Sequence, residues 1–364
     1  MAPAGSACDN MLWWRMKTFR ERVSIYSETT IGKVIFPMSV EESPFELDIR
    51  RIVTDSDLDG VVTGAILRRW WSDADVIFGH PGELRAGVFD GVIDRFTAVC
   101  DLPLHHSCGL SIDHHQSNKP EEDSGDSMII WRESPSAARI AYDVFSERVD
   151  LSDFESLLGW VDKLDSGGIS QEEYLSDNPV LWLSRVIDAG EGIAMKVLEF
   201  LQEGVPVDEI LSDSEVSEMI LEKKREMGVL VSTIRDGMVI EDRMAIVRLD
   251  GIGIRSNGYQ VTAMAGDKCD ACMVIHGDLG ASFGEGESYP VSASFYTNSF
   301  LHPDGGIYDL TALATRFDPD GGGHANACGC RIKPIEQLEV ADREVSGEDI
   351  SRNIAAWLQM WSER

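Results

Sequence analysis

The sequence contains few lysines and no long hydrophobic run. Lysine occurs nine times in 364 residues, aspartate and glutamate together number 63, and the formal net charge at pH 7 is −31. No stretch approaches the roughly 20 apolar residues that a membrane-spanning helix needs. The N-terminal segment MAPAGSACDNMLWWRMKTFRERV lacks the ordered charged, apolar and small-residue regions of a signal peptide. We therefore expect a cytoplasmic protein without membrane contact.

The shortage of basic residues also excludes one class of partner. A body with this net charge repels polyanions at long range, so we expect no tight binding of long nucleic-acid duplexes. An anionic substrate would have to be held locally, by metal ions or by a small basic or glycine-rich pocket. The same acidity suits a protein of a saline cytoplasm, and the composition leaves both interpretations open.

Short apolar runs alternate with amphipathic segments in the first half of the chain. The runs DIRRIV, ADVIF, TAVC and GLSI are typical of strands, and GVVTGAILRRWW has the apolar spacing of a helix. Strands that alternate with helices predict an α/β fold with a mainly parallel sheet. Ligands gather at the carboxyl ends of the strands in such sheets, so the residues that follow each run are the candidate functional residues.

Three alternate aspartates follow the first of these runs, in the stretch TDSDLDG. Alternate residues of a strand share one face, so Asp55, Asp57 and Asp59 point together while the strand lasts. Three converging carboxylates repel one another and stay ionised only if cations neutralise them. A solvated turn is the alternative. A calcium loop fits poorly, because Ile66 stands where such a loop has its bidentate glutamate.

Further potential ligands follow the next runs. Asp101, Asp113, His114 and His115 stand at the ends of strand runs, and Asp165 stands at the end of a helical segment. Asp162 competes with Asp165 for the same role. Carboxylates combined with imidazoles suit Mn²⁺, Fe²⁺ or Zn²⁺ better than Ca²⁺. The set is large enough for two metal ions with one bridging carboxylate, and such a pair is the usual device for phosphoester hydrolysis.

The motifs DSDLDG, a lone Asp101, DHH and LDSG stand in the order of the four motifs of the DHH phosphoesterases, and the sequence resembles that family. The stretch GGGHANACG is similar to the Gly-Gly-Gly-His signature of the domain that accompanies them, and SASFYTN is similar to that domain's substrate-facing strand. The resemblance spans residues 46–335. It is closest to exopolyphosphatase-like, RecJ-like and nanoRNase members.

The resemblance implies a ligand set for two metal ions. Asp55 and Asp57 would hold the first ion. The ligands of the second ion would be Asp59, His114 and Asp165. Asp101 would bridge both ions and, with His114 and His115, would form the catalytic group. Asp113 and His115 would orient the ligand ring or face the substrate.

The glycine-rich stretch is implied to bind substrate. Gly321, Gly322 and Gly323 would let backbone N–H groups approach an anion, since no Cβ intervenes. His324 would donate a hydrogen bond to a phosphate or leaving group, with help from Asn326. An ordinary glycine-rich turn before a strand is the alternative.

The resemblance also implies a division of the chain and places the active site in the cleft between two α/β domains. The expected parts are an N-terminal extension (1–45), a DHH metal-binding catalytic domain with a parallel sheet (46–190), a helical connector (191–234), a smaller DHH-associated substrate-binding domain (235–335) and a C-terminal helix (336–364).

The implied activity is hydrolysis of small phosphorylated substrates with two Mn²⁺ ions, for which Mg²⁺ or Co²⁺ could substitute. The expected substrates are short oligonucleotides, 3′-phosphoadenosine nucleotides, and cyclic or linear dinucleotides. Exopolyphosphatase activity on inorganic polyphosphate is the first alternative. A non-catalytic nucleotide sensor or a subunit of a larger complex is the second. A homodimer also stays open.

Overall fold

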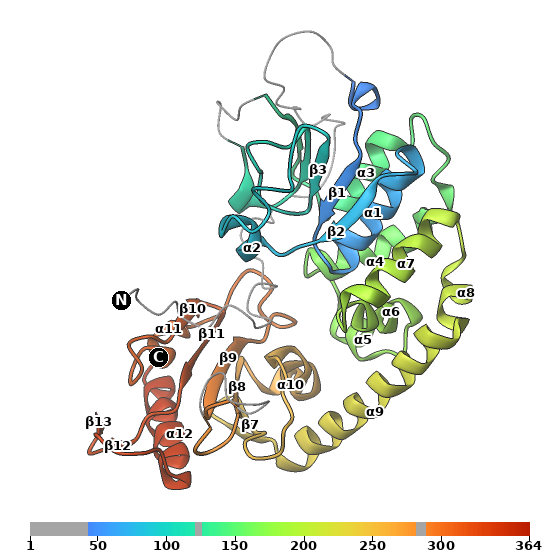
Figure 1. Cartoon of the computed structure of the whole chain (residues 1–364). Coiled ribbons are helices and arrows are strands. Elements are labelled where there is room, and N and C mark those ends of the chain that lie inside the picture. The colour runs from blue at the N-terminus through green and yellow to red at the C-terminus, as the bar shows by residue number, and fades with distance from the viewer. Residues whose placement is uncertain (1–42, 121–125, 282–288) are drawn as a thin grey trace, which may run out of the picture. The chain divides into compact units, whose positions relative to one another are not determined.

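The computed structural model describes residues 43–120, 126–281 and 289–364, which divide into two compact units (Figure 1). The N-terminal unit contains residues 43–120, 126–169 and 176–224, and the C-terminal unit contains residues 170–175 and the described residues from 225 to the end. Nearly all of the predicted N-terminal extension lies outside the described residues. The domain boundaries drawn from the sequence stay predictions.

A five-stranded parallel sheet forms the centre of the N-terminal unit, with the order β2-β1-β3-β4-β5. Its strands are β1 (Arg51–Thr54), β2 (Asp75–Phe78), β3 (Thr97–Cys100), β4 (Leu110–Asp113) and β5 (Met128–Trp131). Every residue of β3 and β4 is buried, which explains why these strands read as continuous apolar runs. Thr54 pairs with Cys100, and Cys100 pairs with Ile112, so β1, β3 and β4 end at one edge of the sheet.

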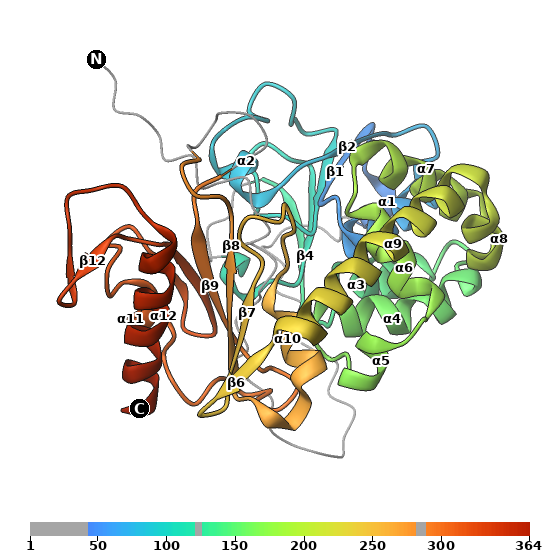
Figure 2. The same ribbon diagram turned by 90° about the horizontal axis from the view of Figure 1, so that it is seen from below.

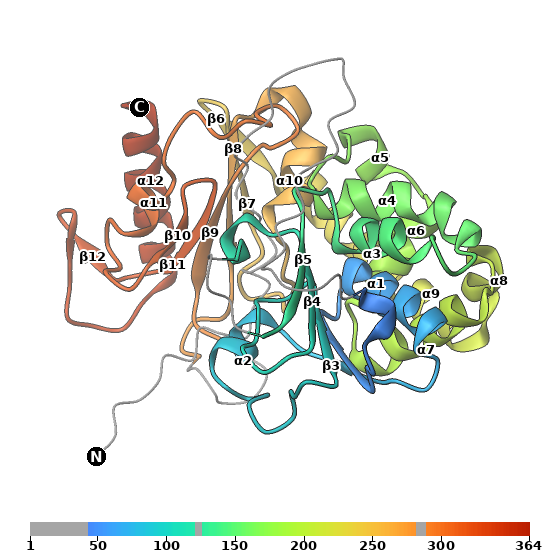
Figure 3. The same ribbon diagram turned by 90° about the horizontal axis from the view of Figure 1, so that it is seen from above.

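Helices cover one face of this sheet (Figures 2 and 3). They are α1 (Leu58–Trp70), α3 (Ala137–Phe145), α4 (Glu155–Asp165), α6 (Pro179–Ile187) and α7 (Glu191–Glu203), followed by α8 (Val207–Ser212). Helix α1 is central, because it contacts α3, α4, α6 and α7, and every residue from Leu58 to Leu67 is buried. The opposite face is covered by the short α2 (Pro81–Arg85) and a core that includes Val53, Phe89 and Val99.

A mixed six-stranded sheet forms the C-terminal unit, with the order β10-β11-β9-β8-β7-β6. Its strands are β6 (Val239–Glu241), β7 (Met244–Arg248), β8 (Ala271–His276), β9 (Ser292–Thr297), β10 (Gly322–His324) and β11 (Ala327–Arg331). Only β7 and β8 pair in parallel among the strands of this described sheet. The structure thus confirms the predicted α/β fold, with a parallel sheet in one unit and a second, mixed sheet in the other.

Helices lie on both faces of the second sheet (Figures 2 and 3). The end of α9 (Ser214–Gly237) and α10 (Gly258–Ala265) pack on one face, and α11 (Thr311–Ala314) and α12 (Gly347–Ser362) on the other. Where the sequence predicted a C-terminal helix from residue 336, the hairpin of β12 (Ile335–Glu336) and β13 (Glu339–Val340) precedes α12. No helix within the described ranges is long and apolar enough to cross a membrane.

Candidate metal centre

The turn after β1 is shaped by its first and last residues. Asp57 is the N-cap of α1, and its Oδ1 accepts a hydrogen bond of 3.0 Å from the backbone N–H of Gly60. A Cβ at Gly60 would lie 2.0 Å from the carbonyl oxygen of Asp55, so only glycine fits there. Thr54 Oγ1 also donates to the carbonyl oxygen of Gly60 at 3.0 Å. The turn thereby fixes Asp59 in the first turn of α1, where it is buried.

Asp101 follows β3 directly and has an uncommon backbone conformation. Its φ is +55°, in the left-handed region that residues other than glycine rarely adopt. Its N–H donates to the carbonyl oxygen of Ile112 at 2.9 Å, and its side chain is 2% exposed. Such strain persists where the surrounding structure holds it, and it concentrates at functional sites.

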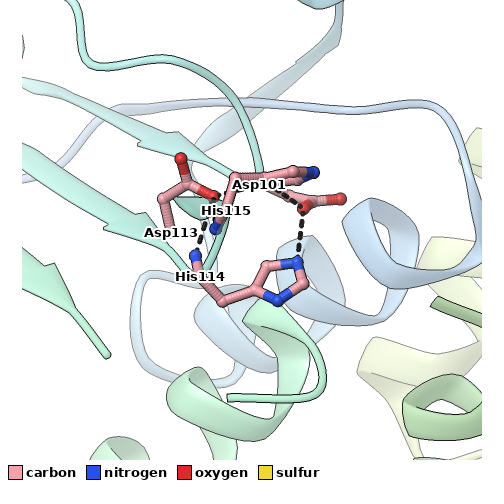
Figure 4. Close-up of side chains that lie close together, drawn as sticks. All are labelled: Asp101, Asp113, His114 and His115. Carbon is pink, nitrogen blue, oxygen red and sulfur yellow. Dashed lines mark hydrogen bonds and ion pairs between the residues drawn. The ribbon is translucent and has the colours of Figure 1, made fainter. Parts of the chain in front are cut away.

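Asp113 organises the histidine pair at the end of β4 (Figure 4). Its Oδ1 accepts hydrogen bonds from the backbone N–H of His114 at 2.7 Å and from Nδ1 of His115 at 2.7 Å. Its Oδ2 accepts from Asn118 Nδ2 at 2.7 Å. Burial alone would raise the pKa of Asp113, but the hydrogen bond and charge of His115 outweigh burial and hold that pKa below its ordinary value. Asp113 is therefore an ionised anchor for the His115 ring.

His114 is the point at which carboxylates from three other segments meet. Its Nε2 lies 3.1 Å from Asp165 Oδ2, 3.5 Å from Asp101 Oδ1 and 3.6 Å from Asp59 Oδ2. Its Nδ1 donates to the carbonyl oxygen of Ser134 at 2.9 Å. That bond fixes the ring with Nε2 facing the carboxylates, as in metal-binding histidines.

The electrostatics of His114 indicate what this position favours. Burial alone would lower its pKa, but hydrogen bonds with Asp101 and Asp165 and the negative charge of Asp59 outweigh burial and raise the pKa of His114 to about 11. The pocket therefore favours positive charge beside these buried oxygens. A divalent cation would supply that charge, and the mixture of carboxylate oxygens and imidazole nitrogen suits Mn²⁺, Fe²⁺ or Zn²⁺.

Six of the residues predicted to form the site come together. Within the described residues, the potential ligand atoms of Asp101, Asp113, His114 and His115 all lie within 4.8 Å of one another, and so do those of Asp59, His114 and Asp165. We call these residues the acid–histidine cluster. Asp113 ends β4, and four others follow β1, β3 or β4, neighbouring strands on either side of the point where the strand order 2-1-3 reverses. Open α/β sheets bind ligands at that point.

Asp55 and Asp57 belong to neither group of ligand atoms. Asp57 Oδ1 caps α1, and Asp55 Oδ1 accepts from the N–H of Ser56 at 2.6 Å and lies 3.4 Å from Nδ1 of His80. Their predicted role at a first metal ion remains a prediction. His80 follows β2 and is the N-cap residue of α2, so it stands at a strand end like the other candidate residues.

Asp162 and Asp165 have different partners, although both lie on α4. Asp165 faces His114, whereas Asp162 accepts hydrogen bonds from Ser136 Oγ at 2.7 Å and from Arg139 Nη2 at 2.6 Å. The geometry therefore favours Asp165 as the potential ligand.

The glycine-rich stretch forms β10 and its connection to β11. A Cβ at Gly321 would lie 2.5 Å from the carbonyl oxygen of Ala314, and one at Gly323 would lie 2.6 Å from that of Ala327. These glycines are required by close backbone packing. Gly322 is half-buried, and a Cβ added to it would have no neighbour within 4 Å among the described residues.

The two polar residues that follow the glycines differ in their surroundings. His324 is exposed. Asn326 Oδ1 accepts from the N–H of Gly306 at 2.8 Å and from Thr297 Oγ1 at 3.2 Å, so its amide oxygen holds the adjoining loop. Substrate binding by this stretch stays a prediction.

No family model and no curated protein matches the sequence. Among solved structures, the chain is similar to a pGpG-specific phosphodiesterase (PggH) from Vibrio cholerae, with a TM-score of 0.67 and 21% identity over 85% of this chain and 98% of that one. It is also similar to RecJ in complex with Mn²⁺ from Thermus thermophilus, with a TM-score of 0.51 and 15% identity over 86% of this chain and 52% of RecJ. The chain thus spans about half the length of RecJ. These likenesses confirm, at the level of the fold, the predicted resemblance to DHH proteins.

Proposed function

We propose that the protein is a divalent-metal-dependent phosphodiesterase that hydrolyses small phosphorylated substrates, and that linear dinucleotides are its first substrate class. One observation carries this proposal. The buried acid–histidine cluster stands at the carboxyl ends of three neighbouring strands, in a fold similar to that of a pGpG-specific phosphodiesterase and of RecJ in complex with Mn²⁺.

The proposed ligands of one ion are Asp59, Asp101, His114 and Asp165, with Asp101 shared with a second ion near Asp55 and Asp57. All four of the first set are largely buried, and three are carboxylates, so a dication would relieve their mutual repulsion. Bound divalent ions would make a nucleophilic water available at neutral pH and neutralise charge on the phosphoryl group. Mn²⁺ is the first ion to test, with Mg²⁺ and Co²⁺ as alternatives.

His115 is proposed to act on the substrate. Asp113 holds its Nδ1 at 2.7 Å, which leaves Nε2 as the nitrogen that can face a phosphate or leaving oxygen. The His115 side chain is 22% exposed, whereas that of His114 is 4% exposed. This difference in access suits a division in which His114 holds metal and His115 contacts substrate. In the C-terminal unit, Gly322 and His324 are the proposed phosphate contacts.

The size of the substrate follows from charge. The net charge of −31 opposes approach of long polyanions, whereas a dinucleotide carries few phosphates and can be neutralised locally. This argument favours dinucleotides and other small phosphorylated nucleotides over long DNA.

The test is a hydrolysis assay with purified protein, with and without Mn²⁺, on pGpG, a short oligonucleotide, 3′-phosphoadenosine 5′-phosphate and inorganic polyphosphate. We expect Mn²⁺-dependent release of GMP from pGpG, resolved by chromatography. Asp101→Asn should abolish this release, and Asp320→Asn, which changes an exposed carboxylate in an ion pair with Arg331, should not.

Each other outcome has a distinct meaning. Release from polyphosphate alone would replace the proposal with an exopolyphosphatase. Tight nucleotide binding without turnover would indicate a sensor. No release from any substrate at any metal concentration would refute the proposed activity.

A further inference from the structure

One short segment contacts three parts of the acid–histidine cluster and its surroundings. Residues 134–138, which we call the bracket segment, precede and begin α3. The carbonyl oxygen of Ser134 accepts from Nδ1 of His114 at 2.9 Å. The N–H groups of Ala137 and Ala138 donate to the two carboxylate oxygens of Asp59, at 2.8 and 2.7 Å. Both backbone donors belong to buried residues, so Asp59 is held in one orientation.

The third link runs from the bracket segment to α4. Ser136 is the N-cap of α3 and is fully buried, and its Oγ accepts from the N–H of Arg139 at 3.0 Å. The same Oγ donates to Asp162 Oδ1 at 2.7 Å. Arg139 donates to Asp162 Oδ2 from Nε at 3.1 Å and from Nη2 at 2.6 Å. Asp162 is thereby held by three hydrogen bonds from the start of α3.

Asp162 lies one helical turn before Asp165 on α4. Residues three apart lie on the same side of a helix, so a restraint on Asp162 also restrains the position of Asp165. Asp165 is the last residue of α4, where helices fray unless they are held. Its Oδ2 lies 3.1 Å from His114, the shortest approach of any carboxylate to that ring nitrogen in the described residues.

We infer that Asp162, bound by Ser136 and Arg139, is a positioning residue that sets the metal affinity of the cluster. The inference rests on the proposed function, because it takes Asp59, His114 and Asp165 as ligands. Through the bracket segment, one structural unit fixes the ring of His114, the carboxylate of Asp59 and the helix that carries Asp165. Asp162 itself is not among the proposed ligands, and its carboxylate is bound by Ser136 and Arg139. Its bonds to Ser136 and Arg139 explain why the chain has a second aspartate so close to Asp165.

The test measures metal binding directly and does not depend on hydrolysis. Mn²⁺ affinity is measured by the loss of the free-ion electron paramagnetic resonance signal, and the coordination geometry is followed by the visible absorption of bound Co²⁺. Residues that orient metal ligands typically change affinity by about 10–100-fold when they are replaced. We expect Asp162→Asn and Ser136→Ala to weaken Mn²⁺ binding by about 10-fold or more and to alter the Co²⁺ spectrum.

Arg139→Gln should have a smaller effect in the same direction, because the Arg139 side chain is 31% exposed and the Ser136 bond remains. Arg139→Lys keeps the charge without the two-pronged geometry and should restore part of the affinity. The effects of Ser136→Ala and Asp162→Asn should be less than additive in the double variant, because the two residues share one hydrogen bond.

A matched control exists in the C-terminal unit. Asp270 also accepts a two-pronged pair of hydrogen bonds from an arginine, Arg243, both of 2.7 Å. Asp270→Asn should lower the thermal unfolding temperature without changing Mn²⁺ affinity, which separates loss of an ion pair from loss of ligand positioning.

Wild-type Mn²⁺ affinity and an unchanged Co²⁺ spectrum in Asp162→Asn would overturn the inference. If Asp162→Asn does not fold, the same two measurements on Ser136→Ala and Arg139→Gln decide it. If the wild type binds Mn²⁺ but hydrolyses none of the substrates, the proposed function fails and the positioning inference still stands. A wild type that binds no divalent ion would refute the metal centre itself, and the positioning inference with it.

Discussion

Replacing Gly60 with alanine tests how firmly the turn after β1 is held. The new Cβ would lie 2.0 Å from the carbonyl oxygen of Asp55, far inside the 3.4 Å at which ordinary contact begins. The opposing atom belongs to the backbone, so relief requires α1 to move away from β1. Helix propensity acts in the opposite direction, because alanine is about 1 kcal/mol more favourable than glycine within a helix.

The two effects oppose each other, and the steric effect should win. Overpacking in buried positions typically costs about 1–3 kcal/mol and occasionally more. Because this overlap is with backbone in a fully buried helix start, we expect the upper end of that range. The net result should be a loss of about 1–2 kcal/mol in the free energy of unfolding, together with weaker Mn²⁺ binding as Asp59 shifts.

Gly159→Ala is the matched control for this substitution. Gly159 lies on α4 and is exposed, and a Cβ added to it would have no neighbour within 4 Å among the described residues. The same chemical change should there raise the free energy of unfolding by about 0.5–1 kcal/mol. Urea unfolding of both variants, with Mn²⁺ titration of the folded proteins, measures the difference. Equal stability of the two variants, with wild-type Mn²⁺ affinity in both, would refute this account of the turn.

Three further predictions concern salt, acid and the histidine pair. With a net charge of −31, the thermal unfolding temperature should rise between about 0.1 and 2 M KCl, as screening weakens self-repulsion, and a constant temperature would contradict this. Burial alone would raise the pKa of Asp318, but hydrogen bonds from Arg331 and Lys333 outweigh burial and lower it to about 2. The ionised Asp318 carboxylate therefore stabilises the fold above its unfolded pKa, and this contribution is lost as pH falls from about 4 to about 2. In Asp318→Asn, the free energy of unfolding should depend less on pH in this range. An unchanged pH dependence would exclude this carboxylate as a source of acid sensitivity. His114→Gln should abolish Mn²⁺ binding, whereas His115→Gln should keep it and lower kcat, and equal loss of Mn²⁺ binding in both variants would contradict the proposed division of roles.

The sequence predicts the chemistry of the cluster better than its geometry. Asp101 and Asp113 could be placed because buried parallel strands read as continuous apolar runs, and the end of each run marks one edge of the sheet. The roles of Asp162 and Asp165 could not be separated, since both precede the same glycine pair on one helix. Only the positions of Ser136 and Arg139 in space distinguish them.

Other parts of the site leave no signal in the sequence. The carbonyl oxygen of Ser134 and the N–H groups of Ala137 and Ala138 are backbone atoms, and any residue except proline could supply the two donors. Residues 170–175 cluster with the C-terminal unit because Tyr174 packs against Tyr259 and Phe300, a long-range contact that composition does not reveal.

The helical region after residue 190 is divided more finely than its apolar spacing predicts. It forms α7, α8 and α9. Gly204, with a φ of +78°, ends α7, and Pro206 stands directly before α8. Glycine after a helix and proline before one are common helix end and start signals. Helical apolar spacing continues on both sides of them, so the sequence alone predicts one long helical region.

The boundary between residues 224 and 225 falls within α9, and two more crossings frame residues 170–175. Neither half of the molecule is therefore one uninterrupted stretch of polypeptide. Truncation at residue 224 would cut α9 and would leave the C-terminal unit without residues 170–175. Fragments cut at these boundaries should therefore be less stable than the whole chain, and an isolated C-terminal unit would need residues 170–175 joined to it by a linker.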